Sequence, residues 1–224
     1  MSEAEPSSFW ETREAVERFA ARDPDVRLFG FLEGHADPSS VRILDLGCAA
    51  GRNTVPLAEA GFDVHAVDGS AAMVARTRDR LAGIVGRGEA ERRVRTGRMD
   101  DLAEFPGGWF DLVAALGVLH QAGSGDEWRR AIGEVCRVLK NGGRFLYAGW
   151  SPASRPEGVP LQAVAGEPDV FLGFHTGRHY LLDAASLDAA LASFGLTPEE
   201  PTAEVRVETE RGERVTVNGL YRLG

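Results

Sequence analysis

The feature that most constrains the fold is a regular alternation of short apolar runs with longer amphipathic segments. The apolar runs lie at residues 41–47, 62–69, 109–120 and 143–150. Segments with helical periodicity, bounded by serine or glycine, separate them. Because apolar strands that alternate with helices are covered on both faces, the pattern predicts a mostly parallel sheet with right-handed crossovers.

The segments outside this alternation predict three additions to the sheet. Residues 1–40 are expected to form an N-terminal helical cap of two helices, the first opened by a capping box of Ser8 and Glu11. Residues 151–182 show no clear period and predict a long substrate loop inserted into the main domain, 41–224. Residues 204–223 predict an antiparallel hairpin around the turn "ERGE". We therefore expect a three-layer α/β fold with a seven-stranded sheet.

Charge and composition exclude several classes of partner. The 224 residues include 34 acidic and 25 basic side chains, a formal net charge of -9. This balance disfavours nucleic acids and anionic membrane surfaces as partners. No apolar run reaches the ~18 residues that a membrane span needs, and the first residues do not resemble a signal peptide. We expect a cytoplasmic protein, and its oligomeric state stays open.

The turn after the first strand, "DLGCAAG", indicates which ligand the sheet binds. Ligands of such folds bind beyond the carboxyl ends of the strands, where Asp45 and Asp68 end two successive strands. A carboxylate at the position of Asp68 suits the two hydroxyls of a ribose. Asp45 suits a cationic amino group and would repel a diphosphate, and the dinucleotide spacing G-x-G-x-x-G is absent. S-adenosylmethionine has the ribose and the ammonium group without a phosphate.

At these residues the sequence resembles the class I S-adenosylmethionine-dependent methyltransferases, and the resemblance covers about residues 41–149. It implies a Rossmann-like sandwich. The "GRN" after the turn and the C-terminal hairpin resemble, more loosely, a small-molecule branch that contains tellurite-resistance methyltransferases.

The resemblance also implies which residues bind S-adenosylmethionine and its product, S-adenosylhomocysteine. Asp45 would reach the amino group through water, Asp68 would bind the ribose, and Met99 would pack on the adenine. The full set of expected cofactor-binding residues is Asp45, Gly47, Cys48, Ala49, Gly51, Asn53, Asp68, Gly69, Ser70, Met73, Met99, Asp100 and Leu116.

Two positions depart from the pattern of the family. Ala49 stands where the family has a middle glycine, and its methyl group fits there if φ is negative. Arg98 stands where the family has an acid, so that Asp100 or Asp101 is left for the adenine amino group.

The substrate side is less specific in sequence. His120 is either a general base or a polar residue that ends a strand. Residues of a possible substrate pocket are Trp10, Trp150, Phe174, His175, Arg178, His179 and Tyr180. The alternatives are ordinary loop packing for the aromatic residues, a solvated Arg178, and a first helix that packs on the sheet. His175 and His179 flank Gly177 without a third ligand, so no metal is predicted.

These observations predict an enzyme that transfers a methyl group from S-adenosylmethionine to a small-molecule acceptor by in-line displacement. One alternative is a non-catalytic scaffold that binds S-adenosylmethionine. The other is a nicotinamide-dependent oxidoreductase, which the missing dinucleotide spacing disfavours.

Overall fold

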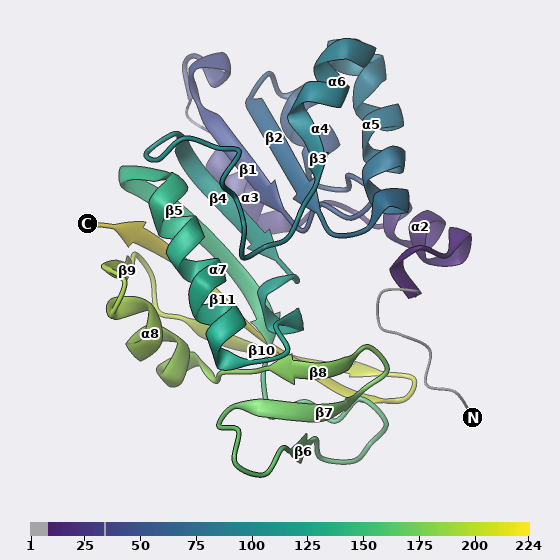
Figure 1. Cartoon of the computed structure of the whole chain (residues 1–224), viewed down its shortest axis with the longest axis vertical. Coiled ribbons are helices and arrows are strands. Elements are labelled where there is room, and N and C mark those ends of the chain that lie inside the picture. Colours follow the sequence, from purple (N-terminus) through teal and green to yellow (C-terminus); the bar gives the residue numbers. More distant parts are fainter. Residues whose placement is uncertain (1–8, 34) are drawn as a thin grey trace. The chain divides into compact units, whose positions relative to one another are not determined.

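The computed structural model describes residues 9–33 and 35–224, and these form two compact units (Figure 1). The first unit ends at Met99, and the second runs from Asp100 to Gly224. Strands and helices occur in both units, which confirms the predicted α/β class. The described residues before position 41 belong to the same unit as the first three strands, and the separate helical cap stays a prediction.

The first unit is built on three parallel strands. Its described elements are α2 (Arg13–Ala20), α3 (Val26–Leu32), the 3-10 helix η1 (Pro38–Ser40), β1 (Arg42–Leu46), α4 (Thr54–Glu59), β2 (Asp63–Asp68), α5 (Ala71–Val85), α6 (Arg87–Arg93) and β3 (Val94–Thr96). Strand β2 pairs in parallel with β1 on one side and with β3 on the other. Ile43, Leu44 and Val64 are fully buried, as expected for strands covered on both faces. Helix α6 was not predicted.

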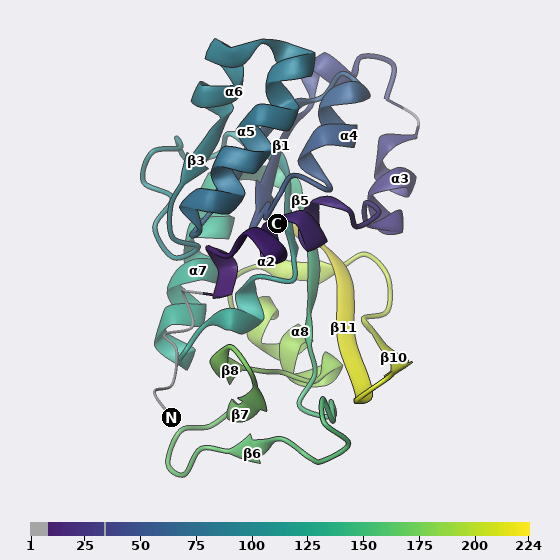
Figure 2. The ribbon, with the colours of Figure 1, turned by 90° about the vertical axis from the view of Figure 1, so that its right-hand side faces the viewer.

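The N-terminal segment is fastened to the start of α5 (Figure 2). Helix α2 begins after Thr12, whose hydroxyl oxygen accepts a hydrogen bond within its own first turn. Ser8 lies outside the described residues. The two carboxylate oxygens of Glu11 accept hydrogen bonds from the backbone N–H groups of Ala71 and Ala72, at 3.0 and 3.1 Å. Glu11 thus caps α5, a role that the sequence did not predict, and its predicted capping box with Ser8 stays a prediction.

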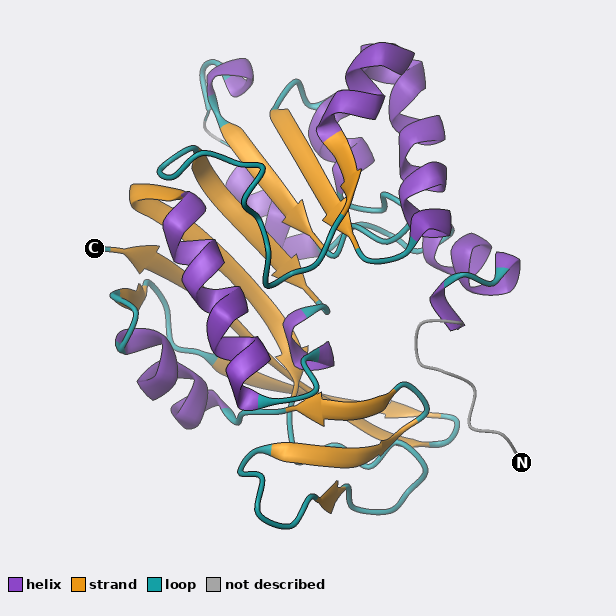
Figure 3. Ribbon diagram, viewed as in Figure 1, coloured by secondary structure: helices purple, strands orange, loops and turns teal. Residues whose placement is uncertain are grey.

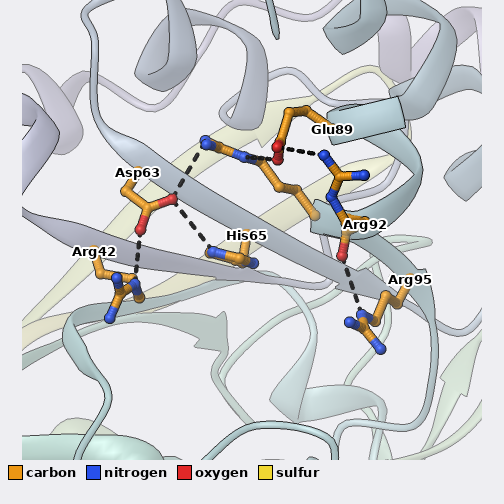
Figure 4. A network of polar contacts seen from close by, with 7 residues as sticks. Arg42, Asp63, His65, Glu89, Arg92 and Arg95 are labelled. Atoms are coloured by element: carbon orange, nitrogen blue, oxygen red, sulfur yellow. Dashed lines mark hydrogen bonds and ion pairs between the residues drawn. The ribbon is translucent and has the colours of Figure 1, made fainter. Parts of the chain in front are cut away.

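A network of polar contacts surrounds Asp63 at the start of β2 (Figure 4). The Asp63 carboxylate accepts from Arg42 at 2.7 Å and lies 3.3 Å from both Arg93 and His65. Arg93 also contacts Glu89 of its own helix at 3.1 Å. Burial lowers the pKa of His65 to about 4, so its ring is neutral at pH 7. The network therefore joins β1, β2 and α6 at the end of β2 opposite Asp68.

The second unit combines parallel and antiparallel strands. Its described elements are β4 (Phe110–Leu116), the 3-10 helix η2 (Leu119–Gln121), α7 (Gly125–Val138), β5 (Leu139–Trp150), β6 (Gln162–Ala163), β7 (Val170–Phe174), β8 (Gly177–Tyr180), α8 (Ala184–Ala192), β9 (Leu196–Pro198), β10 (Ala203–Thr209) and β11 (Gly212–Leu223). Strands β4 and β5 are parallel, and β11 pairs antiparallel with β5, β9 and β10. The predicted C-terminal hairpin is thus confirmed as β10 and β11. The prediction of seven strands missed β9.

The segment 151–182 is not a structureless loop. It contains a small antiparallel sheet in the order β6, β7, β8 (Figure 3). These strands are short, and β6 is exposed along its whole length. The alternation of apolar and polar residues from which a strand is predicted is therefore missing from this part of the sequence. Among the described helices, none has the length and apolar character to cross a membrane.

Candidate functional site

Asp45 presents a buried carboxylate at the carboxyl end of β1. It is 1% exposed, and its Oδ2 accepts a hydrogen bond from the hydroxyl of Thr54 at 2.6 Å. Its Oδ1 is buried and has no hydrogen-bond partner within the described part of the chain. Burial raises the pKa of Asp45 to about 6. Because buried polar atoms are nearly always paired, this oxygen is suited to a donor on a ligand, such as an ammonium group.

Asp68 ends β2 and connects the two turns that follow β1 and β2. Its Oδ2 accepts from the backbone N–H of Ala49 at 2.8 Å, and its Oδ1 accepts from that of Ser70 at 2.9 Å. Burial raises the pKa of Asp68, and the negative charge of Glu11 acts in the same direction. Each carboxylate oxygen has a second lone pair, so the group can still accept from a pair of ribose hydroxyls.

The turn after β1 needs glycine at two of the predicted positions. Gly47 and Gly51 have φ angles of 77° and 80°, which favour glycine. The N–H of Gly47 donates to the carbonyl of Val67 at 2.8 Å, which fastens the turn to β2. A Cβ atom at Gly51 would lie 3.1 Å from the methyl group of Thr77 on α5. Glycine at position 51 therefore lets the turn pack closely against α5.

Ala49, between these glycines, also has a positive φ, of 47°. The expectation of a negative φ was wrong. The backbone of Ala49 is held from both sides, since its N–H donates to Asp68 and its carbonyl accepts from the Thr77 hydroxyl at 2.7 Å. These contacts keep a non-glycine residue in a conformation that costs roughly 1–2 kcal/mol.

Other predicted cofactor residues of the first unit have structural contacts. The thiol of Cys48 is buried, and burial raises its pKa. The side-chain oxygen of Asn53 accepts from the N–H of Asp25 at 3.0 Å and so holds the segment before α3. Met73 lies in an apolar cluster with Ala50 and residues of α2. Gly69 links Asp68 to Ser70, and the Ser70 hydroxyl oxygen caps α5 by accepting from the Met73 N–H at 3.1 Å.

The chain around residue 99 was expected to flank the adenine. Met99 is half-buried. The carboxylate of Asp100 forms an ion pair with Arg130 of α7 at 3.0 Å. Leu116 is buried as the last residue of β4. The roles of these residues toward a cofactor stay predictions.

Four rings gather beyond the carboxyl ends of β4 and β5 in the second unit. His120 follows β4 in η2, and Trp150 is the last residue of β5. Their ring centroids are 4.3 Å apart. Phe174 of β7 stacks on Trp150 at 3.9 Å, and His179 of β8 lies 5.4 Å from Trp150. The small sheet thus brings Phe174 and His179, two of the predicted substrate residues, to Trp150, a third one, and to the candidate base His120.

The two histidines of this cluster differ in their hydrogen bonds. His179 Nδ1 lies 2.9 Å from the Gly177 carbonyl, and its Nε2 lies 2.8 Å from the hydroxyl of Thr176. His120 Nε2 lies 3.1 Å from the side-chain nitrogen of Gln121, whereas its Nδ1 has no partner among the described residues. Burial lowers the pKa of His120 to about 3, and that of His179 to about 4. Both rings are neutral at pH 7, and His120 as placed is a weak base.

The remaining substrate candidates lie in several different places. Trp10 belongs to the first unit, where it packs against Phe19 and its carbonyl accepts from Ser70 at 3.0 Å. These contacts are with α2 and the start of α5, and the alternative that the first helix packs on the sheet stays a prediction. Tyr180 packs beside Trp128. His175 is exposed, and the exposed Arg178 forms an ion pair with Glu167. Across residues 9–33 and 35–224, no group of three or more His, Cys, Asp or Glu side chains is arranged to hold a metal.

Sequence reasoning missed three residues that hold the strand-end groups. Thr54 binds Asp45, Thr77 binds the turn at Ala49, and Glu11 caps α5 beside Asp68. Thr54 opens the helix after the turn, and Thr77 lies on the buried face of α5. For Thr54, a threonine at the first position of the helix that follows the glycine turn was a signal that the sequence offered.

Comparisons with known proteins agree on one family. Residues 44–147 match the family model described as a methyltransferase domain. The ubiquinone biosynthesis O-methyltransferase of Xanthomonas axonopodis pv. citri is 27% identical over 175 residues, covering 76% of this chain and 68% of that protein. The looser resemblance to the tellurite-resistance branch stays a prediction.

Two solved structures share the fold. A structure from Methanosarcina mazei, described as a SAM-dependent methyltransferase, has a TM-score of 0.67 at 17% identity and covers 90% of this chain and 99% of that one. The CcbJ methyltransferase of Streptomyces caelestis has a TM-score of 0.65 at 22% identity, with coverages of 99% and 100%. The match of residues 44–147 to a methyltransferase domain, the relative from Xanthomonas and the paired strand-end acids support the resemblance to the class I S-adenosylmethionine-dependent methyltransferases, and the two solved structures show that the fold is shared.

Proposed function

We propose that this methyltransferase transfers the methyl group of S-adenosylmethionine to a small-molecule acceptor by in-line displacement. The observation that carries the proposal is the unpartnered Oδ1 of Asp45 at the end of β1. Asp68 lies at the end of β2, which pairs with β1. A buried acceptor oxygen suits an ammonium group, and a carboxylate with lone pairs to spare suits a ribose. A dinucleotide would instead place its diphosphate against these acids, which disfavours the oxidoreductase alternative.

Each part of the turn has a role in this proposal. Asp45 binds the amino group of the cofactor, and Asp68 binds the ribose hydroxyls. The backbone from Gly47 to Gly51 flanks the methionine part, and Ser70 borders the adenosine. Bound S-adenosylmethionine supplies a methyl group made electrophilic by its positively charged sulfur. The protein mainly fixes the positions of the reactants, an effect worth ~7–11 kcal/mol in aligned intramolecular reactions.

A small, largely apolar acceptor is supported by two observations. The four-ring cluster of the second unit offers aromatic and neutral imidazole surface. The relative from Xanthomonas is named a ubiquinone biosynthesis O-methyltransferase. Because His120 is a weak base as placed, we propose an acceptor that ionises without help from His120 or loses its proton after the transfer.

The experiment that tests the cofactor site is calorimetric titration with S-adenosylmethionine and S-adenosylhomocysteine. We expect micromolar binding by the wild-type protein and a loss of about 100-fold or more in Asp68→Ala, since hydrogen bonds to charged groups contribute about 1.5–3 kcal/mol each. Asp126→Ala, which removes an exposed carboxylate at the start of α7, is the control and should bind normally. If the wild-type protein binds neither compound, the proposed function is wrong.

A further inference from the structure

One buried polar atom of the second unit has no role in the proposed function, and it is Nδ1 of His120. The residue is 2% exposed, and Nδ1 has no hydrogen-bond partner among the residues that the structure describes. A buried donor or acceptor without a partner costs ~1–3 kcal/mol. Such atoms are rare in folded proteins and call for a specific explanation. A ligand that pairs with Nδ1 provides one.

The neighbouring amide determines where the proton of the ring lies. The side-chain nitrogen of Gln121 is 3.1 Å from His120 Nε2. An amide nitrogen only donates hydrogen bonds, so with the Gln121 amide in this orientation Nε2 accepts and the ring proton is on Nδ1. The unpartnered atom is therefore a hydrogen-bond donor. In this tautomer, Nε2 has already used its lone pair, and Nδ1 has no lone pair with which to remove a proton from an acceptor.

The surroundings of His120 favour a neutral ligand. Its ring lies against Trp150 at 4.3 Å and against His179 at 6.0 Å. Among the described groups, His179 is the titratable neighbour that shifts the pKa of His120, and it too is neutral at pH 7. A full negative charge placed here would lose its hydration without gaining a cation, which is costly. An uncharged oxygen can accept the Nδ1 hydrogen bond without this cost.

The position of the donor fits a ligand site. His120 and Trp150 lie just beyond the carboxyl ends of β4 and β5, which are parallel neighbours. In open α/β sheets ligands bind beyond these ends of the strands. His179, in the same cluster, has partners on both ring nitrogens. Of the two imidazoles, it is therefore His120 that has an atom to offer.

We propose that His120 donates a hydrogen bond from Nδ1 to a carbonyl oxygen of the methyl acceptor, and that the acceptor is an uncharged, carbonyl-bearing small molecule. This inference rests on the proposed function and specifies its substrate class. It makes His120 a substrate-binding donor instead of a general base. A carbonyl conjugated with a hydroxyl also helps that hydroxyl to ionise, which agrees with a transfer that needs no histidine base.

The first test determines the tautomer of His120. Nitrogen-15 NMR of histidine-labelled protein distinguishes Nδ1–H from Nε2–H, and the His120 signals are those that disappear in His120→Asn. We expect the neutral Nδ1–H form throughout pH 5–9. A neutral ring protonated on Nε2, or a charged ring at pH 6, would overturn the proposal.

The second test uses a matched pair of probes, acetophenone and ethylbenzene, which differ in a carbonyl oxygen. Binding is measured by NMR titration in saturating S-adenosylhomocysteine. We expect the wild-type protein to prefer acetophenone by about tenfold, the upper range for one neutral hydrogen bond. His120→Asn, whose amide can place an N–H near the position of Nδ1, should keep part of this preference, and His120→Leu should lose it.

Three results of the probe titration would contradict the inference: equal binding of the two probes, no binding of acetophenone, or a preference that persists in His120→Leu. If the Leu variant does not fold, the wild-type preference and the tautomer decide the matter. Titration of the wild-type protein with S-adenosylhomocysteine comes first. Failure to bind it refutes the proposed function, whereas binding without a carbonyl preference refutes only this inference.

Discussion

The strand ends of the two units are built for different kinds of ligand chemistry. Beyond β1 and β2, the first unit presents two carboxylates and a glycine turn. Beyond β4 and β5, the second unit presents aromatic rings and neutral imidazoles. Among the described residues, each place has one buried polar atom without a partner: the acceptor Oδ1 of Asp45 and Nδ1 of His120. The first suits a cation, and the second suits an uncharged oxygen.

The largest effect is expected from a substitution that removes the negative charge of Asp45 at the end of β1. Asp45→Asn keeps an oxygen for Thr54 but turns an N–H₂ group toward the position of the ammonium. We expect the affinity for S-adenosylmethionine to fall about 100-fold, measured by calorimetry at pH 7.5, since a charge-assisted hydrogen bond is lost. Asp126→Asn is the matched control. An unchanged affinity would show that Asp45 does not bind the amino group.

The same substitution should stabilise the protein without ligand. The folded-state pKa of Asp45, about 6, lies above its usual 3.8. A raised pKa means that stability is full below pH 4 and is lost as the pH rises through 6, by about 2–3 kcal/mol for this shift. The unfolding free energy of Asp45→Asn relative to wild type should therefore rise between pH 4 and 6 and then level off. Urea unfolding across this range measures it, and a flat difference would contradict the prediction.

A smaller effect is expected from relieving the turn between the two acids. Ala49→Gly removes a side chain from a residue with φ of 47°. We expect the unfolding free energy to rise by up to about 1 kcal/mol, because glycine adopts this conformation without strain. Ala60→Gly, at a residue with φ of -75°, should lower it. Thermal unfolding of the two variants gives opposite shifts if the backbone of Ala49 is strained.

The smallest effect is expected at His120, beyond the end of β4, where no change of protonation should occur near neutral pH. His120 has a pKa of about 3, so it stays neutral from pH 5 to 9. Once an acceptor is identified, the pH profile of kcat/KM is measured for the wild-type protein and for His120→Asn. We expect both profiles to have the same inflections between pH 5 and 9, because His120 does not titrate there. An inflection near pH 6.5 that disappears in His120→Asn would restore His120 as the base and would make the two places more alike than the structure shows.

Sequence patterns predicted the parts of the molecule that depend on local order. Asp45, Asp68 and the glycines follow strands whose apolar runs are continuous, so their positions at strand ends could be inferred. The contact of Glu11 with α5 joins residues sixty positions apart, and nothing in the local sequence predicts it. The positive φ of Ala49 was also hidden, because it depends on hydrogen bonds from Asp68 and Thr77. The short strands β6 to β8 lack the periodicity on which strand prediction depends.

The small sheet of the second unit has a consequence for how such an enzyme changes over time. Phe174 and His179 belong to β7 and β8 and contribute their rings to the cluster. Both strands lie in the segment between β5 and α8. Neither Asp45 nor Asp68 lies in that segment. Under the proposed function, recombination could therefore exchange 151–182 as one block and give a new acceptor preference, while the strand-end acids keep their sequence.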